Sequence, residues 1–429
     1  MEIRAFRGWR YRAAAGSDVG LYIAPPYDIL SAQAKEALLA KSPSNIVAVD
    51  LPHVPPSEAG PDEEYAAAAD RLRRWIATGV LCRDDKPSLY AYQQTFEWAG
   101  QTHCRRAMIC SVRLSELGKD VIPHEHTFAG PKADRLKLMR HTRMQLSPIF
   151  GFYRDGEGLG MKLLWSTTAK RGPNVQGRLA GVEEQVWAVK DQHVIRDITL
   201  YLAREPVFIA DGHHRYTTAL NYRDELRAQG PLPDSHPANF VQFALVARDD
   251  PGLLVLPTHR VVRGLKADFS VAKLVTVATE FSWRKVPMDR MDFRDDRALR
   301  QLGPHALALL DAKAGELWVA RLEDAQAMRD AAGDQPDAWR ELDVAILHKL
   351  ILEKALAPWR QGELQIEYTP DGQGALAACA VGKAQLGVLL TGTPIEAVEA
   401  VARAGAVMPH KSTYFYPKLA TGMVLMPLE

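Results

Sequence analysis

Residues 207–216 have the sequence VFIADGHHRY, in which a short apolar run ends in a glycine turn that carries four polar or ionisable side chains. The apolar run predicts a buried strand, and the segment from Tyr216 to Leu226 has the apolar spacing of a helix, so the turn lies at a strand-to-helix junction. Gly212 permits a tight turn, and the N–H groups at the start of a helix attract anions. This stretch therefore predicts where the chain carries out its chemistry.

The turn has two interpretations. Arg215 lies three residues after Gly212, where its guanidinium can bind a phosphate through two hydrogen bonds. Alternatively, Asp211 simply caps the helix, since Asp-Gly is a common turn dipeptide. A cap needs neither two histidines nor an arginine, and clusters of ionisable groups at element ends mark functional sites. We therefore expect Gly212, His213 and Arg215 to bind phosphate.

The composition describes an ordinary globular protein. Of the 429 residues, 47% are hydrophobic and 24% are charged, and the net charge is +1. This length suffices for two or three domains. The balanced charge and the lack of a helix-turn-helix pattern argue against a nucleic-acid partner. The four cysteines have no Cys-x-x-Cys spacing, which argues against a zinc ribbon or a redox pair.

No stretch approaches about 18 consecutive apolar residues, which argues against a membrane span. Residues 1–12 contain four arginines and lack the continuous apolar core of a signal peptide. We therefore expect a cytoplasmic protein that has no membrane partner. The sequence leaves the oligomeric state open.

Strands and helices are mixed along the chain without a regular βαβ alternation, which favours a mixed α/β (α+β) fold. Helices are predicted over 32–39, 63–76, 134–145, 271–280 and 337–356, and strands over 45–51, 88–96, 106–114, 240–247 and 253–262. The pattern changes near Lys266. We therefore predict an N-terminal α/β domain over 1–265 and a C-terminal α/β domain over 266–429.

A second unusual cluster is Pro123-His124-Glu125-His126-Thr127. In an extended segment His124 and His126 would project to one side and Glu125 to the other, a spacing that can bind a metal. Two imidazoles make an incomplete site, so the other ligands would have to come from elsewhere. Acid-base catalysis by Glu125 or His126 is the alternative that we favour.

Cationic residues recur at three further places. Arg135 follows closely behind the histidine cluster, where we expect a phosphate contact. His259 and Arg260 close another apolar strand, and we expect both to bind phosphate. Lys411, Ser412 and Thr413 offer a cation and two hydroxyls to phosphate oxygens, although the frame of a P-loop is missing and no dinucleotide fingerprint occurs.

Six motifs in order resemble a bacterial and archaeal family of unknown function, catalogued as domain of unknown function one-zero-one-five. They are Ala24-Pro25-Pro26-Tyr27-Asp28, Asn45-Ile46-Val47, His124-Glu125-His126-Thr127, Asp211-Gly212-His213-His214-Arg215-Tyr216, Leu256-Pro257-Thr258-His259-Arg260 and Lys411-Ser412-Thr413-Tyr414-Phe415-Tyr416-Pro417-Lys418. The resemblance spans nearly the whole chain, and the family lends no established activity.

The turn by itself is similar to the Gly-x-x-Arg phosphate-binding turn of the ParB and sulfiredoxin superfamily, which includes a free serine kinase. That resemblance implies a ParB/sulfiredoxin-like phosphate-binding core, with an additional α/β region at the C-terminus. It implies that Gly212 and Arg215 contact nucleotide phosphates and that His214 lies beside them. Sulfiredoxin uses a cysteine within this turn, whereas this chain has His213 and His214.

We expect an enzyme of phosphoryl chemistry on a small phosphorylated metabolite or nucleotide, either a kinase or a phosphohydrolase. Positioning and charge neutralisation dominate such chemistry, and we expect Mg²⁺ or another divalent cation, held by Asp211 and Glu125, with ATP or ADP as the nucleotide. Glu125 or Asp211 would activate the attacking hydroxyl or water, and His126 or His214 would carry the proton.

Two other functions remain open on the sequence. The first is a nucleotide-binding switch that works through conformational change. The second is a metal-dependent hydrolase of a non-phosphate bond, which would use the histidines His124, His126, His213, His214 and His259.

Overall fold

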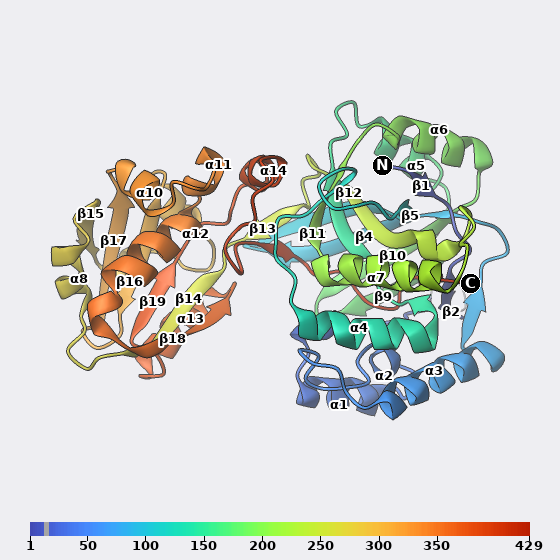
Figure 1. Cartoon of the computed structure of the whole chain (residues 1–429), viewed down its shortest axis with the longest axis horizontal. Coiled ribbons are helices and arrows are strands. Elements are labelled where there is room, and N and C mark those ends of the chain that lie inside the picture. Colours follow the sequence, from blue (N-terminus) through green and yellow to red (C-terminus); the bar gives the residue numbers. More distant parts are fainter. Residues whose placement is uncertain (13–16) are drawn as a thin grey trace. The chain divides into compact units, whose positions relative to one another are not determined.

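The structure, a computed structural model, describes residues 1–12 and 17–429 (Figure 1). These residues form two compact units, a first unit of Met1–Leu253 with Pro417–Glu429 and a second unit of Leu254–Tyr416. The expected boundary at 265/266 instead falls at the end of a strand, His259–Leu265, that pairs with other strands of the second unit. The chain enters the second unit before that strand and returns to the first unit at its C-terminus.

A mixed sheet is the centre of the first unit. In spatial order its strands are β6 (Val121–Ile122), β11 (Val207–Asp211), β8 (Ile149–Tyr153), β12 (Phe240–Ala247), β5 (Gln101–Arg113), β4 (Leu89–Trp98), β10 (Val182–Val189) and β9 (Val175–Leu179), while β1 (Ile3–Arg4) pairs with β5. The pairs β6/β11 and β8/β12 are parallel, and the other pairs are antiparallel. The mixed α/β class expected from the sequence is therefore confirmed.

Helices and short two-stranded ladders complete the first unit. The helices are α1 (Ala32–Lys41), α2 (Val47–Asp50), α3 (Asp62–Ala77), α4 (Ala129–Thr142), α5 (Leu159–Ser166), α6 (Gln192–Leu202) and α7 (His213–Gln229), and the ladders are β2 (Trp9–Tyr11) with β3 (Leu81–Arg83) and β7 (Met144–Gln145) with β21 (Met426–Pro427). Helices α4 and α7 lie side by side, and α3 packs on α4 (Figure 1).

Alternation along the strands builds the core of the first unit. Val241, Phe243 and Leu245 of β12 are buried in one cluster with Tyr216 of α7 and Ile198 of α6. Because successive strand residues point to opposite faces, every second residue of β12 enters this cluster. The buried strand β11 lies between β6 and β8, so the turn after it begins from a fixed position.

The second unit contains its own antiparallel sheet. In spatial order its strands are β15 (Phe281–Val286), β17 (Glu316–Leu322), β16 (Ala306–Asp311), β19 (Leu386–Leu389), β14 (His259–Leu265) and β18 (Arg360–Thr369), and a separate pair joins β13 (Leu254–Leu256) to β20 (Tyr414–Tyr416). The helices are α8 (Val271–Val277), α9 (Arg297–Arg300), α10 (Gln326–Ala331), α11 (Asp337–Arg340), α12 (Asp343–Ile346), α13 (Gly372–Ala380) and α14 (Ile395–Arg403), with a π-helix over Leu347–Ala355.

Two predicted elements are wrong. Residues 45–51 were expected as a strand but contain α2, which begins where the Asn45 side chain accepts a hydrogen bond from the N–H of Val47 at 3.0 Å. Periodicity cannot distinguish a strand from a helix in a short run that is buried on all sides. The single helix expected over 337–356 consists of α11, α12 and the π-helix in succession.

Within the described part of the chain, every helix is too short or too polar to span a lipid bilayer.

Candidate functional site

The turn after β11 forms as the sequence predicts. Strand β11 ends at Asp211, and α7 begins at His213 with Gly212 as its N-cap. Gly212 has a φ of +100°, and a Cβ atom there would lie 2.9 Å from Nε of Arg215. Glycine is therefore strongly favoured, because other residues rarely adopt this left-handed conformation and a Cβ atom would displace the overlying Arg215 side chain.

The Asp211 carboxylate lies between two cations from distant parts of the sequence. Its Oδ2 atom accepts a hydrogen bond from Nη2 of Arg215 at 2.6 Å, and its Oδ1 atom accepts one from Nζ of Lys418. Burial alone would raise the pKa of Asp211, but Lys418 and Arg215 outweigh it and hold that pKa well below its usual range. Asp211 is therefore ionised and anchors both cations at the N-terminus of α7.

Arg215 is also held from the side of β8. Its Nη1 atom donates to the carbonyl of Pro148 and lies 3.3 Å from the Ser147 hydroxyl oxygen. The side chain keeps 13% of its surface exposed. A guanidinium carries five N–H donors, so these contacts fix its position and leave donors for an anion.

His213 joins the turn to the His-Glu-His segment. Its Nε2 atom accepts a hydrogen bond from the backbone N–H of His124 at 3.2 Å, and its Nδ1 atom lies 3.6 Å from Oε2 of Glu125. Burial, together with the neighbouring His124, lowers the pKa of His213 well below its usual value. The ring is therefore neutral, and the acceptor role of Nε2 assigns the proton to Nδ1, on the side of Glu125.

The three residues of the His-Glu-His segment differ in their exposure to solvent. His124 is buried, and burial lowers its pKa to about 4. Glu125 keeps 35% of its side chain exposed, and His126 is exposed. The two imidazoles therefore differ in their access to solvent, and Glu125 is the partly exposed member that also lies against His213 of the turn.

His214 contacts the start of the neighbouring helix. Its Nε2 atom accepts a hydrogen bond from the N–H of Phe128 at 2.9 Å, and the two rings stack with their centroids 6.0 Å apart. Phe128 is the N-cap of α4. The N-termini of α4 and α7 therefore lie next to each other, and both present the positive end of a helix dipole.

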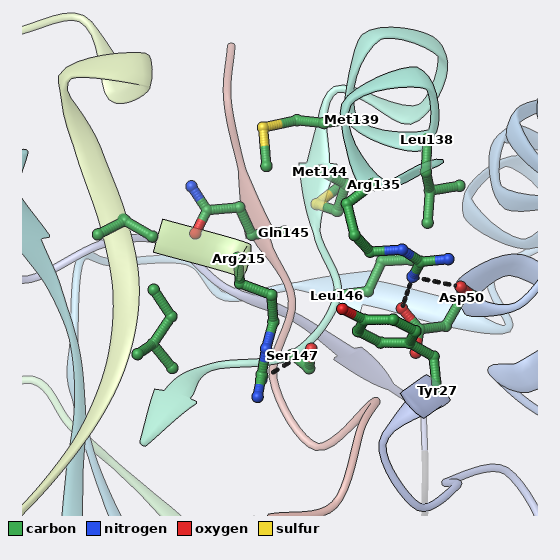
Figure 2. A pocket seen from close by; sticks show the side chains of 12 residues that line it. Tyr27, Asp50, Arg135, Leu138, Met139, Met144, Gln145, Leu146, Ser147 and Arg215 are labelled. Atoms are coloured by element: carbon green, nitrogen blue, oxygen red, sulfur yellow. Dashed lines mark hydrogen bonds and ion pairs between the residues drawn. The ribbon is translucent and has the colours of Figure 1, made fainter. Parts of the chain in front are cut away.

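A small cavity of about 40 Å³, enough for about one water molecule, lies between Arg215 and Arg135 (Figure 2). Arg135 is buried, donates to Asp134 at 2.6 Å and to the carbonyl of Asp50 at 2.6 Å, and its Cζ atom lies 3.9 Å from the Tyr27 ring centroid. Protein groups thus already compensate its charge. The phosphate contact expected of Arg135 remains a prediction, and we leave it out of the set proposed below.

The other predicted residues belong to the second unit. His259 is buried, and its Nδ1 atom accepts from the N–H of Leu390 at 3.2 Å. Arg260 is buried and donates to the carbonyl of Lys411 at 3.1 Å. Lys411 is exposed, Ser412 is buried with its hydroxyl donating to the carbonyl of Pro409, and Thr413 is partly buried. Phosphate binding by His259, Arg260, Lys411, Ser412 and Thr413 remains a prediction.

Sequence reasoning missed two residues that contact this site. Lys418 closes the C-terminal motif, but nothing in its spacing connects it to Asp211, which lies 207 residues earlier. Asp50 was included in a predicted strand and instead ends α2, where its buried carboxylate faces Arg135 at 3.3 Å. The available signals were the aromatic and proline residues before Lys418 and the prolines that follow Asp50.

Among the described residues, no group of three or more His, Cys, Asp or Glu side chains is arranged to hold a metal ion. Both oxygens of Asp211 accept hydrogen bonds from cations. The metal-ligand role expected of Asp211 and Glu125 remains a prediction, and the proposed chemistry uses only this chain's own groups.

A model of the family described as "Protein of unknown function (DUF1015)" matches residues 3–345. Among curated proteins, none matches the chain. Solved structures similar to it include a mutant of free serine kinase in complex with AMP, at 12% identity and a TM-score of 0.36, covering 72% of this chain and 86% of that one. A conserved hypothetical protein from Pyrococcus furiosus is 13% identical at a TM-score of 0.36, covering 75% and 95%. Likenesses at this level carry no argument about fold or activity.

Proposed function

We propose that this chain, which belongs to the DUF1015 family of proteins of unknown function, binds a phosphate group at the turn of residues 211–215 and catalyses phosphoryl chemistry there. The substrate would be a small phosphorylated metabolite or a nucleotide such as ATP or ADP. The observation that carries the proposal is the gathering of Arg215 and Lys418 around Asp211 at the N-terminus of α7.

Charge at the turn supports an anionic ligand. Two cations face one carboxylate, and the N-termini of α4 and α7 add their dipoles on the same side. Backbone N–H groups at a helix start and an arginine fork are the groups that bind phosphate in proteins. Asp211 is too weak a base to take a proton, because its neighbouring cations stabilise the ionised form.

Glu125 is the better base. Its carboxylate is partly exposed, and the neutral His213 ring orients it from the buried side. In the proposed step Glu125 takes the proton of a hydroxyl or water, the oxygen forms a bond to phosphorus, and the bond from phosphorus to the leaving oxygen breaks. Arg215 and Lys418 neutralise the charge on the phosphoryl oxygens.

Thermal-shift measurements on the full chain test the binding step. We expect ATP, ADP or phosphoserine, each added with and without Mg²⁺, to raise the melting temperature of the wild type, because a ligand selective for the folded state stabilises it. Arg215→Ala should abolish the shift. Arg223→Ala is the matched control, since Arg223 lies on the same helix, is 12% exposed and also contacts a carboxylate and a carbonyl.

A phosphorus NMR assay of the shifting ligand tests the chemistry. Glu125→Gln should retain the thermal shift and lose turnover, whereas Glu116→Gln, an exposed residue paired with Lys119, should change neither. Transfer to a hydroxyl would identify a kinase, and release of inorganic phosphate a phosphohydrolase. Binding without turnover in the wild type would instead favour the nucleotide-binding switch, and equal shifts in Arg215→Ala and the wild type would exclude the proposed turn.

A further inference from the structure

A cavity of about 480 Å³ lies within the second unit, and none of the residues that line it belongs to the proposed phosphate site. Its walls are the residues that precede β16, the connection from α11 to α12, and the start of α14. Leu342, Pro304 and Ala397 provide apolar surface, while His305 and Arg300 provide nitrogen donors. Cavities of this size with an apolar lining and a few fixed polar groups are typical of small-molecule sites.

His305 is held in one orientation. Its Nδ1 atom lies 3.0 Å from Oδ1 of Asp343, and the other oxygen of that carboxylate accepts from the Thr391 hydroxyl at 2.7 Å. The hydrogen bond with Asp343 raises the pKa of His305 above its usual value. Since Nδ1 is engaged, Nε2 is the ring nitrogen that a molecule in the cavity would meet, and in the protonated ring it is a donor.

Arg300 is fixed in a similar way. Its Nη2 atom lies 2.6 Å from Oδ2 of Asp296 and donates to the carbonyl of Gly392 at 3.0 Å. The same Asp296 oxygen accepts from the N–H of Gly392 at 2.7 Å. The side chain of Arg300 nevertheless remains 47% exposed, so the guanidinium keeps a face toward the surroundings while its carboxylate partner holds it in place.

We propose that this cavity binds a small organic acid, with its carboxylate or phosphate group between His305 and Arg300 and its apolar body against Leu342 and Ala397. Fixed charge-assisted donors bind a negatively charged acceptor more strongly than a neutral one, and the apolar wall favours a ligand with an organic body over an inorganic ion. Glu341 and Asp343 are the acidic residues of the lining, and Asp343 is already engaged by His305 and Thr391.

Four probes, each added to the full chain, distinguish the requirement for a negative charge from the requirement for an apolar body. Benzoate and phenyl phosphate carry both an anion and an apolar body, inorganic phosphate lacks the body, and benzyl alcohol lacks the charge. With histidine side chains labelled with carbon-13, we expect saturable changes in the His305 ring resonances with benzoate, phenyl phosphate or both. Benzoate alone would identify a carboxylic acid as the ligand class, phenyl phosphate alone a phosphate ester, and both an organic anion in general.

The variants are His305→Asn and Arg300→Gln. His305 has a φ of +58°, a conformation that asparagine tolerates, so His305→Asn removes the ring without straining the backbone. Because His305→Asn lacks the observed ring, binding to both variants is measured by isothermal titration calorimetry, and loss of one charge-assisted hydrogen bond should weaken it about tenfold or more in each. His141→Asn is the matched control, because His141 also pairs with a carboxylate, that of Asp62, but lies in the first unit.

Three results would overturn the proposal: no change at His305 with either organic anion, equal effects of benzyl alcohol and benzoate, or unchanged binding in both variants. Inorganic phosphate that binds as tightly as phenyl phosphate would also contradict it, because the apolar wall would then play no part.

Discussion

Replacing Lys418 by methionine tests the contact on which the proposed site depends. The change removes one of the two cations on Asp211 while it keeps most of the volume of the side chain. Among the described residues, Asp211 would then keep Arg215 as its hydrogen-bonded cationic partner. We expect a less stable first unit and weaker phosphate binding at the turn.

The exposures of the two side chains set the magnitude. The side chains of Lys418 and Asp211 keep 15% and 16% of their surface exposed to solvent, so the pair is intermediate between a buried and an exposed salt bridge. Breaking a buried pair costs about 3–5 kcal/mol, and an exposed pair is worth about 0–1 kcal/mol. Because Arg215 continues to compensate Asp211, we expect a loss of about 2 kcal/mol, or a fall of about 4–8 °C in melting temperature for a unit of this size.

Calorimetry can measure this loss against a matched pair. Lys190→Met breaks a salt bridge in the same unit in which the side chains of Lys190 and Asp85 keep 40% and 66% of their surface exposed. We expect this change to cost less than about 1 kcal/mol of unfolding free energy. Adding Asp211→Asn to Lys418→Met should cost less than the sum of the single changes, because the two residues interact directly. If Lys418→Met is no more destabilising than Lys190→Met, the cation pair on Asp211 does not exist as described.

For two further perturbations, a pH change at Glu184 and the variant Gly212→Ala, the structure determines the direction of the change in stability. Burial raises the pKa of Glu184 from 4.5 to about 7, so the folded state binds this proton more tightly than the unfolded chain. The stabilisation that the bound proton gives is complete below pH 4.5 and is lost as the pH rises through about 7. Urea unfolding across this range should therefore show the wild type losing up to about 1.4 kcal/mol per pH unit relative to Glu184→Gln, and parallel curves would contradict the assignment. Gly212→Ala forces a Cβ atom onto Arg215 at a positive φ, whereas Gly100→Ala is strained by φ alone because no atom lies within 4 Å. The first variant should lose about 1–3 kcal/mol together with the phosphate-induced thermal shift, and a retained shift in Gly212→Ala would show that the turn tolerates the added atom.

The sequence predicted those elements whose pattern is local. Strand β11, the glycine turn and α7 follow from an apolar run, a residue without a Cβ atom and helical spacing, all within about twenty residues. The helix α2 was predicted wrongly because its residues are buried on every side, so that neither a period of two nor of 3.6 is visible. The entry into the second unit before β14 was missed because strand pairing, and not composition, decides which unit a strand joins.

Contacts between distant segments could not be predicted. Lys418 reaches Asp211 because the last residues of the chain return to the first unit, where the Gln94 side chain donates to the carbonyl of Lys418 at 3.2 Å and Arg105 donates to that of Pro417 at 2.6 Å. These partners on β4 and β5 hold the segment against the sheet. A pattern of residues along one segment carries no information about such pairings.

The two adjacent histidines show what geometry adds to a motif. On the sequence, His213 was expected to bind phosphate and His214 to carry a proton. In the structure His213 is buried and neutral and presents a proton to Glu125, while His214 accepts from the N–H of Phe128 at the start of α4. A ring whose pKa lies well below neutrality cannot hold a second proton, so in the proposed step His213 positions Glu125. The proton of the attacking group then leaves through the partly exposed Glu125 carboxylate, so we expect Glu125→Gln, and not a change at Asp211, to separate turnover from binding.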